Sequence, residues 1–125
     1  MISVIDDDEH MCSATKNLVQ SLGYSVYAFS SAEEFLRSPR SSDTSCLITD
    51  IQMPGMSGIE LQAHLIDQGR LASIIFITAY PDEGLRARAL EAGAICFLNK
   101  PFHRQALIEC LDEAVRRHSV RGDED

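Results

Sequence analysis

Side chains able to do chemistry follow four short apolar runs of this 125-residue chain. The runs at 2–5, 46–49, 74–77 and 95–98 are followed by the acidic stretch Asp6, Asp7, Asp8 and Glu9, by Asp50, by Thr78 and by Lys100, respectively, and each group begins one or two positions after its run. If the runs are parallel strands, their carboxyl ends share one edge of a sheet, where such folds place their ligand site. We therefore expect carboxylates, a hydroxyl and an ammonium group to converge there.

The charges of this group indicate its chemistry. Asp6, Asp7 and Asp50 would repel one another strongly if they were ionised at close range. A hard divalent cation, Mg²⁺ or Mn²⁺, relieves that repulsion and prefers carboxylate and carbonyl oxygens. Lys100 is one of only two lysines in the chain, and its compact ammonium group pairs with a carboxylate or a phosphoryl group. A cation and an ammonium group beside a carboxylate are what phosphoryl transfer to that carboxylate requires.

Hydrophobic periodicity predicts the elements that position these residues. Five short apolar runs have the character of strands, and they lie at 2–5, 24–29, 46–49, 74–77 and 95–98. Helical spacing fills the intervening segments, at 11–22, 31–36, 59–69, 82–92 and 107–115, whereas 38–44 reads as a polar loop. Strands that are apolar on both sides and alternate with helices predict a doubly wound α/β fold with helices on both faces of a parallel sheet.

Composition excludes several classes of protein. Hydrophobic residues make up 45% of the chain and charged residues 24%, which is typical of one soluble globular domain. The net charge of −8 argues against nucleic acid or an anionic membrane as a direct partner. No membrane span and no signal peptide are predicted, so we expect a cytoplasmic protein. The four cysteines are scattered without a C-x-x-C pair, and we expect reduced, small buried hydrophobes.

Four segments, taken together and in order, resemble the receiver domains of two-component response regulators. They are Ile-Asp-Asp-Asp-Glu at 5–9, Thr-Asp-Ile-Gln-Met-Pro-Gly-Met-Ser-Gly at 49–58, Ile-Thr-Ala at 77–79 and Phe-Leu-Asn-Lys-Pro-Phe at 97–102. The resemblance implies a flavodoxin-like (βα)5 fold with strand order 2-1-3-4-5, a receiver domain at 1–118 and a frayed tail at 119–125. The segments 31–36 and 53–58 are most similar to the FixJ-type branch, whose members usually carry a LuxR-type helix-turn-helix.

The resemblance also implies a role for each matching residue. Asp50 would be the phosphoacceptor, and Mg²⁺ would be held by Asp7, Asp50 and the backbone carbonyl of Gln52, with Asp6 acting through a water molecule.

Further residues would respond to the phosphoryl group. Thr78 and Lys100 would bind it, Ala79 would leave room for it, and Phe97 would turn inward on activation. The bond before Pro101 would be a cis peptide.

The implied function is a signalling switch and not an enzyme, with at most weak self-phosphorylation from small donors and autodephosphorylation. A sensor histidine kinase would supply the phosphoryl group. The face made by the helix near 82–92 and the strand near 95–98 would engage a LuxR-type output domain or a second receiver, in a phosphorylation-induced dimer, and thereby control transcription. We interpret the chain as a receiver excised from a longer regulator, a stand-alone receiver being the alternative.

Two other functional classes use related patterns. A phosphatase or phosphotransferase of the haloacid-dehalogenase type also has a nucleophilic Asp after a strand, but it needs a second Asp two residues later, where this chain has Gln52. A flavodoxin-like cofactor module needs a Ser-, Thr- or Gly-rich phosphate loop after its first strand, where the acidic run at 6–9 would repel a phosphate.

Two side chains are placed to tune the lifetime of an aspartyl phosphate. Gln52 lies two positions after Asp50 and could orient a hydrolytic water, whereas Tyr80 lies two positions after Thr78 and could cover the phosphoryl group. Pro81 restricts the backbone of Tyr80 and favours a fixed ring. We expect shielding by Tyr80 to dominate and to give a long-lived phosphoryl group.

Overall fold

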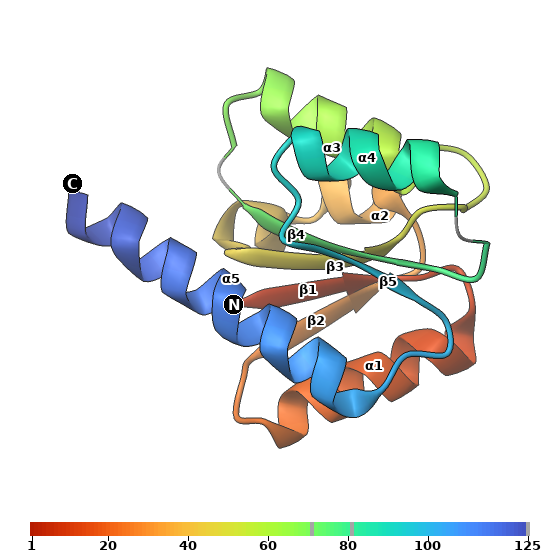
Figure 1. Ribbon diagram of the computed structural model, residues 1–125, viewed down its shortest axis with the longest axis horizontal. Coiled ribbons are helices and arrows are strands. Elements are labelled where there is room, and N and C mark those ends of the chain that lie inside the picture. Colours follow the sequence, from red (N-terminus) through yellow and green to blue (C-terminus); the bar gives the residue numbers. More distant parts are fainter. Residues whose placement is uncertain (71, 81, 125) are drawn as a thin grey trace.

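A computed structural model describes residues 1–70, 72–80 and 82–124, with side chains described as far as Arg117 (Figure 1). The strands are β1 Ile2–Ile5, β2 Val26–Phe29, β3 Cys46–Asp50, β4 Ser73–Thr78 and β5 Cys96–Asn99. The α-helices are α1 Glu9–Ser21, α2 Ala32–Arg37, α3 Gly58–Asp67, α4 Glu83–Glu91 and α5 Arg104–Glu124, and a 3-10 helix, η1, spans Pro39–Asp43. No helix in the described ranges combines the length and the apolar character needed to cross a bilayer.

The strands form one parallel sheet in the order β2-β1-β3-β4-β5, which confirms the predicted fold class. Ile5 lies opposite Thr49, and Asp50 lies opposite Ile77, so the carboxyl ends of β1, β3 and β4 reach the same edge. The residues that directly follow β1, β3 and β4 are therefore neighbours in space although they are far apart in sequence.

Helices cover both faces of the sheet: α1 and α5 lie on one side, and α2, α3 and α4 lie on the other (Figure 1). The α1 and α5 side is filled by buried side chains that include Val4, Val19, Ile48, Ile75, Leu107 and Leu111. The opposite side is filled by Ile5, Phe35, Leu47, Leu61, Leu65 and Phe76. Successive strand residues contribute to opposite clusters, as the two-residue period of a strand requires.

Polar caps fix where the helices next to the functional edge begin. The Asp8 carboxylate accepts the backbone N–H groups of His10 and Met11 and so starts α1 immediately after β1. The Ser31 side chain caps α2 by accepting the backbone N–H of Glu34. Ser57 and Glu60 form a reciprocal capping box at the start of α3. These caps hold the loops that carry the acidic residues against rigid elements.

Several element bounds differ from the sequence-based expectations. The segment expected to be a loop contains η1, which begins at Pro39, a residue whose fixed φ suits a first helical position. β2 begins at Val26, two residues later than expected: the register with β1 starts at Val26, although the Ser25 carbonyl already accepts the Ile2 N–H at 2.9 Å. The helix α5 continues to Glu124, past the expected domain end at 118, and Asp125 lies outside the described residues.

The expectation that all four cysteines act as reduced, small buried hydrophobes is wrong for two of them. Cys96 and Cys110 form a disulfide, with their Cα atoms 6.1 Å apart. Sequence spacing did not reveal the pair, because only the packing of α5 on β5 brings them together. Among the described residues Cys12 and Cys46 are the free cysteines, and both are buried as expected.

Candidate functional site

Three aspartates meet at the carboxyl edge of the sheet. Asp6 and Asp7 follow β1, and Asp50 is the last residue of β3. One carboxylate oxygen from each lies within 4.8 Å of the others. Asp6 and Asp50 are only 5% and 8% exposed, whereas Asp7 is exposed to solvent. The convergence predicted from the sequence is therefore present in the structure.

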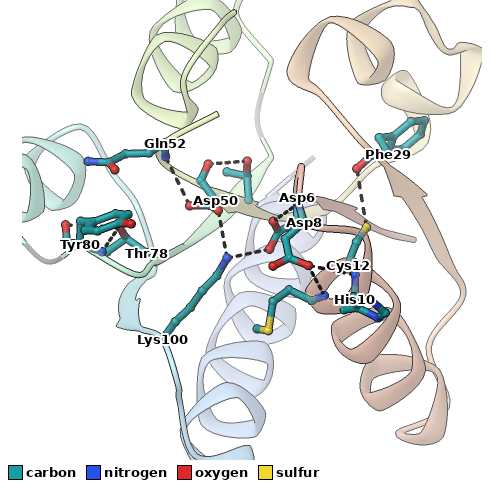
Figure 2. Close-up of polar contacts among 12 residues, drawn as sticks. Asp6, Asp8, His10, Cys12, Phe29, Asp50, Gln52, Thr78, Tyr80 and Lys100 are labelled. Atoms are coloured by element: carbon teal, nitrogen blue, oxygen red, sulfur yellow. Dashed lines mark hydrogen bonds and ion pairs between the residues drawn. The ribbon is translucent and has the colours of Figure 1, made fainter. Parts of the chain in front are cut away.

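Lys100 bridges two of these carboxylates from the end of β5. Its Nζ lies 2.9 Å from Asp6 Oδ2 and 3.0 Å from Asp50 Oδ2, so one ammonium group donates to both (Figure 2). The backbone N–H of Lys100 also donates to the Thr78 carbonyl at 2.7 Å. The Lys100–Pro101 peptide bond is cis, as the family resemblance implies.

Burial and charge act in opposite directions on the two ends of this bridge. Burial raises the pKa of Asp50 above its ordinary value, and this effect outweighs the opposing hydrogen bond and charge of Lys100. For Lys100, burial alone would lower the pKa, but hydrogen bonds to Asp6 and Asp50 outweigh it and raise the pKa. The lysine is therefore held as a cation, whereas the ionised form of Asp50 is energetically costly.

The donor set suits a hard divalent cation. The three aspartates offer only oxygen ligands, and one of them, Asp7, faces solvent, from which a cation and its waters would arrive. Asp6 Oδ1 accepts the Asp8 N–H at 2.9 Å, and Asp50 Oδ1 accepts the Gln52 N–H at 3.3 Å. These backbone bonds fix the orientation of the two buried carboxylates before any cation binds.

Thr78 closes the edge on the β4 side, and its hydroxyl is engaged locally. Its Oγ1 accepts the Tyr80 N–H at 3.0 Å and donates to the Tyr80 carbonyl at 3.3 Å. Thr78 is 1% exposed, whereas Ala79 is exposed and Tyr80 is 69% exposed. Figure 2 shows the side chains of Gln52 and Tyr80 on the side of Asp50 away from Asp6 and Asp8.

Phe97 lies on β5, on the face of the sheet covered by α3 and α4. Its ring is partly buried, with its centroid 6.4 Å from that of Phe76. The two rings are tilted by 52°. Phe97, which the family resemblance implies would turn inward on activation, is thus a core neighbour of Phe76.

The backbone beside Asp50 has room only for a glycine at position 58. The N–H of Gly58 donates to the Ile51 carbonyl at 2.8 Å, and a Cβ at this residue would overlap the Asp50 carbonyl oxygen. Since that oxygen belongs to a buried strand, the clash cannot be relieved by a side-chain rotation. Gly58 therefore allows α3 to begin directly against the acceptor strand.

We expect Gly58→Ala to lower the free energy of unfolding by about 1–3 kcal/mol, as overpacking against backbone does. Urea denaturation followed by circular dichroism measures this loss. Gly84→Ala in α4 is the control, because its added Cβ would meet only the end of the Asp82 side chain, at 3.2 Å. Equal stability of the Gly58→Ala variant and the parent would contradict the close approach.

Glu33 is a contributor to the site region that sequence reasoning missed. Its Oε2 accepts the Met56 N–H at 2.9 Å and so ties the start of α2 to the loop between β3 and α3. The same carboxylate would overlap a Cβ at position 55, where the glycine has φ +78°. The Met56 N–H lowers the pKa of Glu33. The contact spans 23 residues, and no local sequence signal points to it.

A carboxyl whose pKa is lowered by folding stabilises the fold above its unfolded value, near 4.3, and loses that effect as the pH falls through the lowered value. We therefore expect Glu33→Gln to lower the thermal midpoint at pH 7 and the difference to close below about pH 4. Melts at several pH values test this. Glu34→Gln controls for the loss of a negative charge in the same turn, and a Glu33→Gln deficit that is constant with pH would contradict the assignment.

Comparisons with known proteins agree with this geometry. A family model described as the response regulator receiver domain matches residues 2–112. The chain is 39% identical over 121 residues to nodulation protein W of Bradyrhizobium diazoefficiens, covering 97% of this chain and 53% of that protein. It spans about half the length of the curated relatives it matches.

Solved structures give the same result. The response regulator StyR superposes with a TM-score of 0.90 at 40% identity, covering 98% of this chain and 62% of that one. The structure titled FixJ-N superposes with a TM-score of 0.80 at 33% identity, covering 90% of each chain. The parallel sheet, the cluster of Asp6, Asp7 and Asp50, and the Lys100 bridge agree with these matches. Together they show that the chain belongs to the receiver domain family of two-component response regulators, which are phosphorylation-controlled regulators.

Proposed function

We propose that Asp50 accepts a phosphoryl group from a phosphohistidine of a sensor kinase and that this modification switches the domain between two states. One observation carries the proposal: the buried Asp50 carboxylate lies within a cluster of acidic ligands and is held by the Lys100 ammonium group at 3.0 Å. This arrangement gives a nucleophilic oxygen and the positive charge that a phosphoryl group needs.

In the transfer, an Asp50 carboxylate oxygen forms a bond to phosphorus while the bond between phosphorus and the donor imidazole nitrogen breaks. The electron pair leaves with that nitrogen. Lys100 already donates to Asp50 Oδ2 and would pair with a phosphoryl oxygen on the same side. Asp7, Asp50 and the Gln52 carbonyl, with Asp6 through water, would hold Mg²⁺, which supplies charge neutralisation when bound.

Switching would begin at Thr78. Its hydroxyl would have to give up the bond that it donates to the Tyr80 carbonyl before it could donate to a phosphoryl oxygen, but it would keep accepting the Tyr80 N–H. The exposed, small Ala79 would leave space beside it. The Thr78 carbonyl accepts the Lys100 N–H, so movement of one residue is passed to the other. Phe97, three residues before Lys100, would then pack further toward Phe76.

The surface formed by α4 and β5 would carry the signal outward, because Phe97 lies on β5 and Thr78 leads into α4. We propose a sensor histidine kinase as donor and a LuxR-type output domain or a second receiver as the partner of this surface, in the cytoplasm. Phosphorylation would then favour a dimer through α4 and β5. Sedimentation of the protein with and without phosphorylation tests the dimer.

The test of the proposed function is phosphoryl uptake. We expect incubation with acetyl phosphate and Mg²⁺ to add the mass of one phosphoryl group per chain, and EDTA to prevent it. Peptide mapping should place the group on Asp50. Multiple turnover of a small phosphate ester without stable modification would instead support a phosphatase of the haloacid-dehalogenase type.

We further expect Tyr80→Ala to shorten the lifetime of the phosphorylated protein severalfold. The ring is exposed here, but the Tyr80 backbone is bonded to Thr78, so the movement of Thr78 would carry Tyr80 with it toward the phosphoryl group. The measurement is first-order decay after removal of the donor. Tyr27→Ala, which truncates another exposed ring, is the control, and unchanged or slower decay in Tyr80→Ala would contradict shielding.

A further inference from the structure

The disulfide lies next to the elements that the proposed switch uses. Cys96 is the first residue of β5, and Cys110 lies in the second turn of α5. The covalent ring that they close, residues 96–110, contains Phe97 and Lys100. The ring closed by this disulfide therefore includes both Lys100, which bridges Asp6 and Asp50, and Phe97, the aromatic residue of the proposed switch.

The position of β5 makes this bond mechanically important. β5 is an edge strand that pairs only with β4 within the described sheet. Cys96 packs with the cluster beneath α5, and its neighbour Phe97 packs on the opposite face toward α3 and α4. A bond from Cys96 to α5 therefore restrains β5 on the face opposite Phe97. In the proposed switch, Phe97 would have to move on this same strand.

The other two cysteines are unsuited to exchange with this pair. Cys12 and Cys46 are both buried, and burial raises the pKa of Cys46 to about 12. Burial also raises the pKa of Cys12, whose Sγ lies 3.7 Å from the Phe29 carbonyl. Thiols that stay protonated are poor nucleophiles, so they should not compete for Cys96 or Cys110.

We propose that Cys96 and Cys110 form a reversible dithiol–disulfide pair, through which the redox state of the surroundings controls how freely β5 and α5 move and therefore how readily Asp50 is phosphorylated. The second part of this statement rests on the proposed function, whereas the first does not. A disulfide inside a cell is more often transient and regulatory than structural.

The chemistry balances with a low-molecular-weight disulfide as oxidant. Cys96 is the more exposed of the two residues, and its thiolate would attack one sulfur of the oxidant, break that S–S bond and release one thiolate. Cys110 would then attack Cys96 Sγ and release the second thiolate. The two protons of the protein thiols end on the two released thiols, and a dithiol reverses both steps.

The experiment compares the protein equilibrated in oxidised glutathione with the protein in excess dithiothreitol. In the oxidised sample we expect two fewer titratable thiols, the loss of two hydrogens in intact mass and one crosslinked peptide joining Cys96 to Cys110. We also expect slower hydrogen exchange in β5 and the first turns of α5. Amides that exchange by global unfolding should slow by up to roughly a hundredfold, the chain-entropy expectation for a ring of about fifteen residues.

Phosphoryl uptake from acetyl phosphate is measured separately and should be severalfold slower in the oxidised sample. Cys96→Ser and Cys110→Ser should each abolish both redox effects, and Cys96→Ala is added because Cys110 is 5% exposed and its replacement can perturb packing. Cys46→Ala should keep both effects.

Absence of the crosslinked peptide, or hydrogen exchange that does not depend on redox state, overturns the pair. A redox-dependent exchange with unchanged uptake overturns the coupling, and failure of uptake in both samples counts against the proposed function instead.

Discussion

Asp50→Asn is expected to abolish phosphoryl uptake completely and to leave the fold intact or slightly more stable. Uptake stops because an amide is a far weaker nucleophile than a carboxylate. Asp6 and Asp7 do not replace Asp50 as acceptor, because they follow β1 and not β3. The fold should hold because Lys100 still pairs with Asp6, and because one of three mutually repelling carboxylates is removed. Intact mass after acetyl phosphate treatment, together with urea denaturation, measures both effects.

Asp43→Asn is the matched control for this variant. Asp43 is exposed and, among the side chains that the structure describes, pairs with Arg40 alone, at 3.9 Å, in the same 3-10 helix. The Asp43→Asn variant should therefore take up one phosphoryl group per chain, as the parent does. A phosphoryl mass on Asp50→Asn would move the acceptor to another residue.

Lys100→Met is expected to lower the free energy of unfolding by about 3 kcal/mol in EDTA, the usual cost of removing one partner from a buried ion pair. Lys100 donates to Asp6 and Asp50, and the side chains of all three are at most 13% exposed. Without the lysine, two carboxylates face each other with no cation between them. Millimolar Mg²⁺ should recover part of the loss, because a ligand that binds only the native state stabilises it.

Urea denaturation in EDTA and in Mg²⁺ measures this effect, and Lys16→Met, which removes the other lysine of the chain, is the control. Lys100→Arg should restore much of the stability. It should still impair switching, because a planar guanidinium group does not replace a compact ammonium beside a phosphoryl group in a tight site. Identical midpoints for the parent and Lys100→Met in EDTA would rule out the bridge as a source of stability.

The fold was largely predictable because the three central strands, β1, β3 and β4, are short apolar runs buried on both faces. An unbroken apolar run such as Ile74, Ile75, Phe76 and Ile77 is buried only if both faces of its sheet are covered. The functional residues then follow directly after the ends of such runs. Asp50 and Thr78 are the last residues of β3 and β4, so the expected strands ended one residue too early. Polar side chains at strand ends carry no periodic signal that would include them.

Contacts made across the fold were not predictable in the same way. The Cys96–Cys110 bond and the Glu33 tie to Met56 each join residues of different elements, 14 and 23 positions apart, so no pattern within one element points to them. The bonds between the Thr78 hydroxyl and the Tyr80 backbone belong to the same class, because no sequence pattern indicates them. Such details are fixed by packing after the elements have assembled.

The long last helix gives the domain a lever arm. In Figure 1 the C-terminal turns of α5 extend past the body of the sheet and its covering helices. The helix starts four residues after Lys100 and runs unbroken for 21 residues, or about 31 Å at 1.5 Å per residue. A tilt of about 10° at its first turn would sweep its last turn through roughly 5 Å. Leverage alone would thereby amplify a displacement of a fraction of an ångström at the first turn into one that spans a side-chain contact.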